Sequence, residues 1–192
     1  GIDAGDIDRD GVVDIVIGNF SQEMVAFFRG IEAGYFIDDA AQVGIGIPTL
    51  MTLAFGTLVD DFDNDGWLDI LLVNGHIEPN ISQTQRAQAY RQPPQFFRNL
   101  GEGRFSPPDD NFIWPEQKML VARGCASADF DLDGDLDFVV TQNGDYACLL
   151  RNESVGNNWL RIMLRGHESN RIGYGAKLQI VSGETVMTRF LA

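Results

Sequence analysis

The sequence predicts an all-β fold: a partial β-propeller of about three four-stranded blades with Asp-rich loops, followed by a small β module. Three observations support this prediction. A nine-residue Asp-rich pattern occurs three times, each copy runs into a short apolar segment, and an aromatic hairpin pattern follows after a variable gap. Repeated units of this kind are typical of architectures in which one supersecondary unit stacks on the next.

The Asp-rich pattern has carboxylates at positions 1, 3, 5 and 9 and a glycine at position 6, and it occupies residues 6–14, 61–69 and 129–137. An apolar run rich in β-branched residues follows each copy, at residues 15–17, 70–73 and 138–140, and ends at Asn or Gly. Such runs, closed by turn residues, predict short strands. Since they lack strict alternation of polar and apolar residues, we expect both faces of these strands to be covered.

Further elements complete each unit. Small residues precede each Asp-rich segment, at 4–5, 54–56 and 124–128. A hairpin pattern follows each apolar strand, and its first strand ends in Phe27-Phe28-Arg29-Gly30, Phe96-Phe97-Arg98-Asn99 or Leu149-Leu150-Arg151-Asn152. Four strands with small residues on the first suit a propeller blade, whose inner strands are crowded near the axis. The predicted blades cover about residues 1–45, 46–115 and 116–156, so that residues 1–156 form one propeller region.

Two segments fall outside this pattern. Residues 75–95 interrupt the second unit with Pro, Gln, Asn and Ser, and we expect an insertion loop on one face, with a short polar helix at 82–91. The repeat stops at residue 157. Residues 157–192 are expected to be the start of a small, truncated β module, with strands at 159–164 and 176–181 joined by a Gly-rich turn at 166–175; segment 159–164 is also a candidate outer strand for the third blade.

The charge of the chain is concentrated in the Asp-rich segments. The sequence has 28 acidic and 14 basic side chains, which gives a net charge of -14, and twelve of the acids stand at positions 1, 3, 5 and 9 of the repeats. This acidity argues against nucleic acid or anionic lipid as a partner. No apolar run approaches the length of a membrane span, so we expect no membrane insertion.

Four carboxylates converge at one point only around a cation, because packed like charges repel one another. A hard, oxygen-seeking cation fits this donor set, and position 7 would add its backbone carbonyl. The predicted metal ligands in three sites are Asp6, Asp8, Asp10, Val12 and Asp14; Asp61, Asp63, Asp65, Trp67 and Asp69; and Asp129, Asp131, Asp133, Asp135 and Asp137.

Calcium (Ca²⁺) is the cation that fits best, because magnesium prefers near-ideal octahedra that retain several waters. The helix-loop-helix calcium motif is excluded, since it needs a Glu at position 12, where this chain has Ile17, Leu72 and Val140. The alternative is a set of solvated Asp-rich turns without metal. The occurrence of three copies with Asp at the same four positions argues against this alternative.

The three Asp-rich loops resemble the FG-GAP/VCBS repeats of integrin-type β-propellers. Several other segments are similar to the cartilage acidic protein family, whose C-terminal module is called ASPIC/UnbV: residues 74–79, 90–94, 97–101, 123–124, 158–160, 166, 169–171 and 173–176. The resemblance implies a secreted, calcium-loaded propeller followed by a small β module. It also implies that this chain is a fragment of a longer protein.

The function predicted from these observations is a non-enzymatic, calcium-binding extracellular module that interacts with a protein or glycan ligand and with further blades of the same chain. We expect it to be secreted, periplasmic or on a cell surface. The alternative is an accessory or catalytic domain acting on polysaccharide, through acids outside the loops. Two free carboxylates about 5–9.5 Å apart in a cleft would favour that alternative.

Two further expectations concern packing. Cys125 and Cys148 are predicted to lie on strands separated by a third, too far apart for a disulfide, and therefore to be buried thiols. An open arc of three blades would also expose apolar residues, such as Val16 and Phe36 on the first blade and Val139 on the third.

Overall fold

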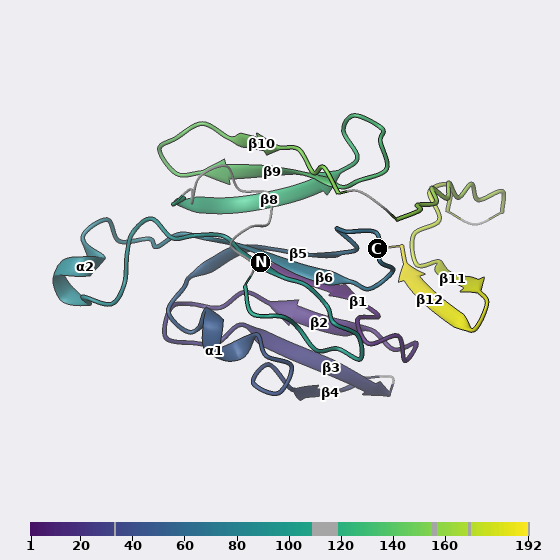
Figure 1. The fold of residues 1–192 in the computed structure, drawn as a ribbon, viewed down its shortest axis with the longest axis horizontal. Coiled ribbons are helices and arrows are strands. Elements are labelled where there is room, and N and C mark those ends of the chain that lie inside the picture. The colour runs from purple at the N-terminus through teal and green to yellow at the C-terminus, as the bar shows by residue number, and fades with distance from the viewer. Residues whose placement is uncertain (33, 109–118, 155–156, 169, 192) are drawn as a thin grey trace.

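The chain folds into small antiparallel sheets, and the computed structural model describes residues 1–32, 34–108, 119–154, 157–168 and 170–191. Three sheets correspond to the three repeats and lie side by side, while a two-stranded hairpin lies beyond the Asp-loop ends of the sheets (Figure 1). The prediction of an all-β fold with blade-like repeats is therefore confirmed.

The three sheets share one order of strands. The first contains β1 (Ile2–Gly5), β2 (Asp14–Ile17), β3 (Ala26–Glu32) and β4 (Tyr35–Asp38). The second contains β5 (Ala54–Asp60), β6 (Asp69–Asn74) and β7 (Gln95–Phe97), and the third contains β8 (Ala122–Ala128), β9 (Asp137–Gln142) and β10 (Cys148–Leu150). In every sheet the Asp-rich segment connects the first strand to the second.

The expectation of four strands in every blade was wrong for the second and third sheets, since their described residues form three strands each. In the second blade the return segment makes a single bridge, between Asn99 and Phe105. Positive φ angles at Gly101, Glu102 and Gly103 curl the chain there, so a longer ladder does not form. In the third blade the sequence lacks the closing aromatic part of the hairpin. The first blade, by contrast, has all four strands, and all four residues of its inner strand β1 face β2.

Helices are minor elements of the described chain. The first, α1 (Gly46–Thr49), precedes β5, and the second, α2 (Ile81–Thr84), lies in the insertion and anchors it through the buried Ile81. The helix expected at 82–91 is thus reduced to a single turn. No helix in the described ranges has the length and apolarity needed to cross a membrane.

The inner strands pack closely from blade to blade, with β1 against β5 and β5 against β8. A Cβ on Gly56 would lie 2.5 Å from Cys125 Sγ and 3.0 Å from its backbone nitrogen. A side chain at this position would therefore push the two inner strands apart, which explains the run of small residues before each Asp loop.

The hydrophobic core consists of two layers between neighbouring blades. Side chains of β6 alternate between them: Ile70 and Leu72 join the layer shared with the first blade, whereas Leu71 and Val73 join the layer shared with the third. All six residues of β6 are buried. The expectation that the central apolar strand is covered on both faces is confirmed for this blade.

The C-terminal part of the chain forms a hairpin of β11 (Lys177–Ser182) and β12 (Thr185–Phe190). The strand expected at 176–181 is confirmed, with a shift of one residue, and its partner β12 was not foreseen. Residues 159–164 form no strand, so both expectations for this segment were wrong. They carry no ladder to the third blade and instead reach its Asp loop through side chains.

The two cysteines flank one strand, as expected, because Cys125 and Cys148 both face Val140 across their ladders. The two cysteines form no disulfide. They are half-buried instead of fully buried, and burial raises the pKa of the Cys125 thiol to about 12.

Candidate metal centres

All three Asp loops have the same backbone shape. Position 4 has a positive φ in each, with 64° at Arg9, 56° at Asn64 and 66° at Leu132. The glycine at position 6 follows with 88°, 92° and 100°. Two left-handed residues so close together fold the segment into a tight coil, and the second one explains the glycine of the pattern.

Short hydrogen bonds inside the loops orient the carboxylates at position 5. The backbone N–H of position 7 donates to this carboxylate at 2.7 Å in the first loop (Val12 to Asp10), 2.8 Å in the second (Trp67 to Asp65) and 3.1 Å in the third (Asp135 to Asp133). In the first two loops the carboxylate at position 3 accepts a hydrogen bond from the backbone N–H of position 5, at 3.2 Å. Each bond lets a short Asp side chain mimic a turn of the backbone.

The Asp at position 9 is a buried brace. Its carboxylate accepts the N–H of position 2 of its own loop on one oxygen and an N–H at the end of the third strand on the other. For Asp69 these donors are Phe62 at 3.3 Å and Asn99 at 2.8 Å. This residue therefore ties the loop to the blade that carries it, a role that the sequence pattern alone does not reveal.

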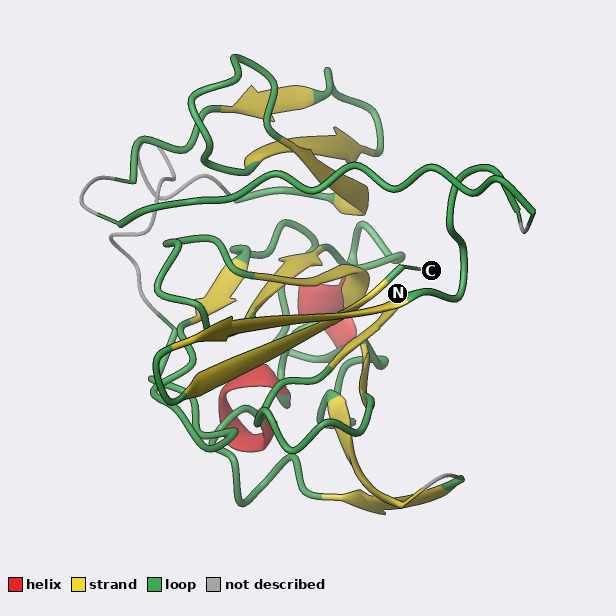
Figure 2. Cartoon of the chain, turned by 90° about the vertical axis from the view of Figure 1, so that its right-hand side faces the viewer, coloured by secondary structure: helices red, strands yellow, loops and turns green. Residues whose placement is uncertain are grey.

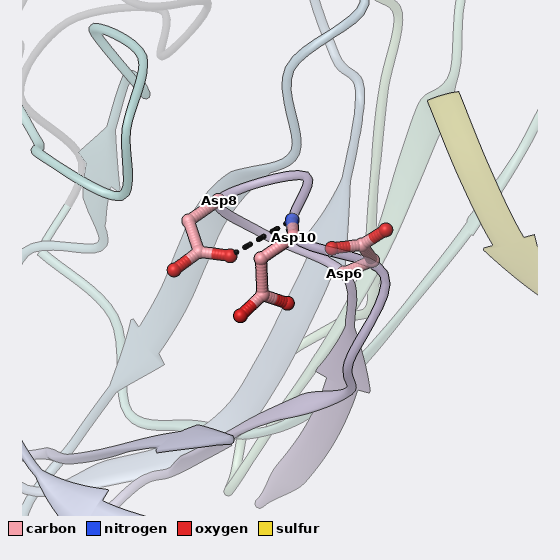
Figure 3. A group of neighbouring side chains, drawn as sticks. All are labelled: Asp6, Asp8 and Asp10. Atoms are coloured by element: carbon pink, nitrogen blue, oxygen red, sulfur yellow. Dashed lines mark hydrogen bonds between the residues drawn. The ribbon is translucent and has the colours of Figure 1, made fainter. Parts of the chain in front are cut away.

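The carboxylates of each loop come together. Oxygen atoms of three Asp side chains lie within 4.8 Å of one another in each loop, and the groups are Asp6, Asp8 and Asp10; Asp61, Asp63 and Asp69; and Asp129, Asp131 and Asp137. The first of these is drawn in Figure 3, with the hydrogen bond from Asp10 to Asp8. Each group could hold a metal ion. The remaining predicted residues lie in the same loops but outside these groups: Val12, Asp14, Asp65, Trp67, Asp133 and Asp135.

Position 1 provides the clearest indication that a cation fits these loops. Asp6 Oδ2, Asp61 Oδ1 and Asp129 Oδ1 are buried and have no hydrogen-bond partner among the described residues. A buried carboxylate oxygen without a hydrogen-bond partner is costly, so its recurrence at one position of three loops fits a site at which this oxygen contacts a cation. The hard, all-oxygen donor set suits a cation such as calcium.

The electrostatics of the loops lead to the same conclusion. Burial, as the largest cause, together with neighbouring carboxylates raises the pKa of Asp14 and Asp61 to about 6 and that of Asp69 to about 8. Ionising these groups together is therefore unfavourable unless a cation compensates the charge.

Comparisons with known proteins agree with this geometry. Residues 61–140, which include the second and third loops, match the family described as FG-GAP-like repeat. Cartilage acidic protein 1 of Xenopus tropicalis is 28% identical over 171 residues, and the human protein of the same name is 26% identical over 171 residues. Both alignments cover 86% of this chain and 24% of the relative, so the chain spans about a quarter of the length of these relatives.

Residues 61–140 are therefore similar to FG-GAP-like repeats. The matches confirm the resemblance to these repeats and to cartilage acidic proteins that the sequence indicated.

Each of the three blades also contains an arginine that the sequence reasoning did not assign to the site. Arg29 pairs with Asp8, Arg98 with Asp63 at 3.0 Å, and Arg151 with Asp131 at 2.6 Å. In every case the partner is the Asp at position 3. The signal was present in the sequence, because each arginine follows the paired apolar residues of the third strand. These arginines offset part of the charge of each loop from its outer side.

Consecutive blades are connected through the same loops. Asn99 Nδ2 of the second blade donates to Ile7 O of the first loop at 3.0 Å, and Asn152 Nδ2 of the third blade donates to Phe62 O of the second loop at 2.7 Å. Each acceptor is the carbonyl of position 2. The shape of one loop is therefore fixed in part by the next blade.

Proposed function

We propose that this chain is a calcium-binding, extracellular interaction module in which one Ca²⁺ is held by each Asp loop. The observation that carries the proposal is the buried, unpartnered oxygen at position 1 of all three loops. In each loop a position-1 carboxylate, a position-3 carboxylate and a third Asp would contact the ion. Calcium would supply no reaction chemistry here, and its contribution would be to fix the loops and the blade edges.

The choice of calcium rests on the donors. All the converging side-chain atoms are carboxylate oxygens, which suit calcium or magnesium and not zinc, whose protein sites favour His and Cys. The irregular loop coil suits the flexible coordination of calcium. We expect weak affinity, on the order of 10⁻⁴ to 10⁻³ M, as in other extracellular calcium modules.

The proposed role is to present a rigid surface to a protein or glycan partner, because binding sites are often placed on loops of a stiff scaffold. Similarity to cartilage acidic proteins supports an extracellular location. Further blades of a longer chain are a second proposed partner. A cavity of about 580 Å³ adjoins the second and third loops, and among its described lining residues Asp60 is the one acid outside the loops. That cavity offers no pair of free carboxylates, so we propose binding and not catalysis.

Calorimetry of chelator-treated protein tests the proposal. We expect calcium to bind at three sites and zinc to give no comparable heat. Asp61→Asn is expected to remove one site and leave two, because it removes the charge of the unpartnered carboxylate. Asp145→Asn, which makes the same change at an acid outside the loops, is expected to keep all three sites. Absence of calcium heat in the unmodified chain would refute the proposal.

A further inference from the structure

The C-terminal part of the chain contacts all three Asp loops. We refer to residues 157–168 and 170–191 as the cap. Figure 2, which faces the Asp-loop side, shows the strands of the cap lying across the ends of the blades. The long segment before β11 runs along the third blade in the same view.

The cap meets each loop at or beside the glycine of position 6. Lys177 Nζ donates to Gly11 O of the first loop at 3.0 Å. Arg189 Nη2 lies 3.4 Å from Gly66 O and 3.6 Å from Asp61 Oδ2 in the second loop. In the third loop Trp159 covers Gly134 so closely that a Cβ there would overlap its indole ring.

Cap and cation would use different atoms of the same carboxylates. Arg161 pairs with Asp129 through Oδ2, and Arg189 lies near Oδ2 of Asp61. The oxygens left buried and unpartnered are the other ones, Oδ1 of Asp129 and Oδ1 of Asp61. A docked cap and a loaded loop are therefore sterically compatible.

The cap has little interior of its own. Most residues of β11 and β12 are exposed or half-buried, and Thr188 is the one buried residue of the hairpin. An isolated two-stranded hairpin is at best marginally stable in water. Its order in this chain therefore depends on contacts outside the hairpin, and its contacts with the Asp loops are among these.

Those contacts require the coiled shape of the loops. The cap touches the Gly66 carbonyl and the open face of Gly134, and both are presented by the left-handed backbone at position 6. Repulsion among the converged carboxylates opposes that shape, whereas a bound cation would favour it. A cation that stabilises the coiled loops therefore also favours docking of the cap on them.

We propose that docking of the cap is coupled to calcium loading of the three Asp loops, so that calcium holds the cap in place and the cap strengthens calcium binding. This inference rests on the proposed function. It adds that the calcium sites and the cap form one cooperative unit, although none of the cap residues named above is a proposed calcium ligand.

Hydrogen exchange measured by mass spectrometry tests the coupling in the whole chain. Amides of β11 and β12 are expected to exchange about tenfold faster, or more, when calcium is removed by a chelator, because the undocked hairpin opens readily. Amides of β6, whose residues are all buried in the blades, are expected to change much less.

Trp159→Ala tests the reverse direction without changing any charge. Loss of the indole contact is expected to release the cap in the presence of calcium. By reciprocity it is expected to weaken calcium binding about three- to tenfold in calorimetry. Met163→Ala is the matched control, because Met163 lies in the same segment and is 74% exposed, and it is expected to change neither quantity. Unchanged exchange of β6 in both variants would show that the blades remain folded.

The outcomes separate the two proposals. If calorimetry shows calcium binding while hairpin exchange is the same with and without calcium, the coupling is overturned and the calcium proposal stands. Equal calcium affinity of Trp159→Ala and the unmodified chain would also overturn the coupling. If no calcium binds at all, the proposed function fails, and the coupling fails with it.

Discussion

Within a single loop, the repeated pattern of Asp residues divides into two physical roles. The carboxylate at position 9 accepts a backbone N–H on each of its oxygens, whereas the one at position 1 keeps an oxygen without a hydrogen-bond partner. The spacing of the Asp residues predicted the loop and the convergence of its carboxylates. It could not predict this division, because the division depends on which N–H groups the folded chain brings to each oxygen.

Asp69→Asn and Asp61→Asn are therefore expected to have opposite effects. Asn at position 69 places an NH₂ against a backbone donor, so it is expected to lower the free energy of unfolding by about 2 kcal/mol even in chelator. Asn at position 61 removes a buried charge that lies beside Asp63 and Asp65 and is only partly offset by Arg189, so in chelator it is expected to cost little or to stabilise. Urea unfolding of both variants in chelator provides the comparison, and equal destabilisation would contradict the division of roles.

The raised pKa values of Asp14, Asp61 and Asp69 predict how calcium-depleted protein responds to pH. These carboxyls hold protons in the folded chain at pH values where the unfolded chain has released them. The stability that these three carboxyls contribute is therefore full below about pH 4 and is lost as the pH rises through about 6 to about 8. We expect calcium-depleted protein to melt about 5 °C or more lower at pH 8 than at pH 5.

Calcium is expected to reverse that trend, because it favours the ionised carboxylates. The stabilisation by calcium, measured as the shift in Tm, is expected to be larger at pH 8 than at pH 5. A calcium-depleted protein that is more stable at pH 8 would contradict this explanation of the loop electrostatics.

Between elements, the connection from blade to blade depends on a few buried amides. Asn99 is 1% exposed, and its Nδ2 donates to Ile7 O at 3.0 Å and to Leu68 O at 2.9 Å. Asn99→Ala leaves both carbonyls without this donor, so it is expected to cost about 2 kcal/mol of stability. Asn80→Ala, at an exposed position of the insertion, is the control and is expected to be neutral within about 0.5 kcal/mol. Equal urea midpoints for the two variants would show that this amide does not connect the blades.

The strands that the sequence predicted best are those with a local signal. Apolar runs after each Asp loop became β2, β6 and β9, and the Phe-Phe and Leu-Leu pairs became parts of β3, β7 and β10. The fourth strands of the later blades and the strand at 159–164 were not found, because a strand also needs an edge to pair with. Trp159 and Arg161 instead contact the third loop through their side chains. A local sequence pattern does not predict contacts of this kind, because they depend on where the folded chain places the loop.

For the molecule as a whole, the third blade presents an unpaired face. Val139 is 41% exposed and Leu149 53%, although Val16 and Phe27, at the equivalent positions of the first blade, are fully buried against the second. The expected exposure of Val16 was therefore wrong, since the second blade covers it. Exposure was correctly expected for Phe36, at 42%, and for Val139.

This face is expected to make the chain associate in solution, because exposed apolar blade surfaces favour contacts with other copies. Phe130 strengthens the expectation: it is 67% exposed, whereas Ile7 and Phe62 are 0% exposed at the same loop position. The double variant Phe130→Ser and Leu149→Ser is expected to shift light scattering toward the monomer. A monomeric unmodified chain at high concentration would contradict this prediction.

The central claim of this account is that each Asp loop holds one Ca²⁺ on the oxygen left free at position 1. The most direct measurement is anomalous diffraction from crystals grown with calcium. The account predicts three peaks, each within coordination distance of Asp6, Asp61 or Asp129 and of a second carboxylate in the same loop. Crystals in which ordered water or a lysine or arginine side chain occupies those positions, with no anomalous peak at any loop, would contradict it.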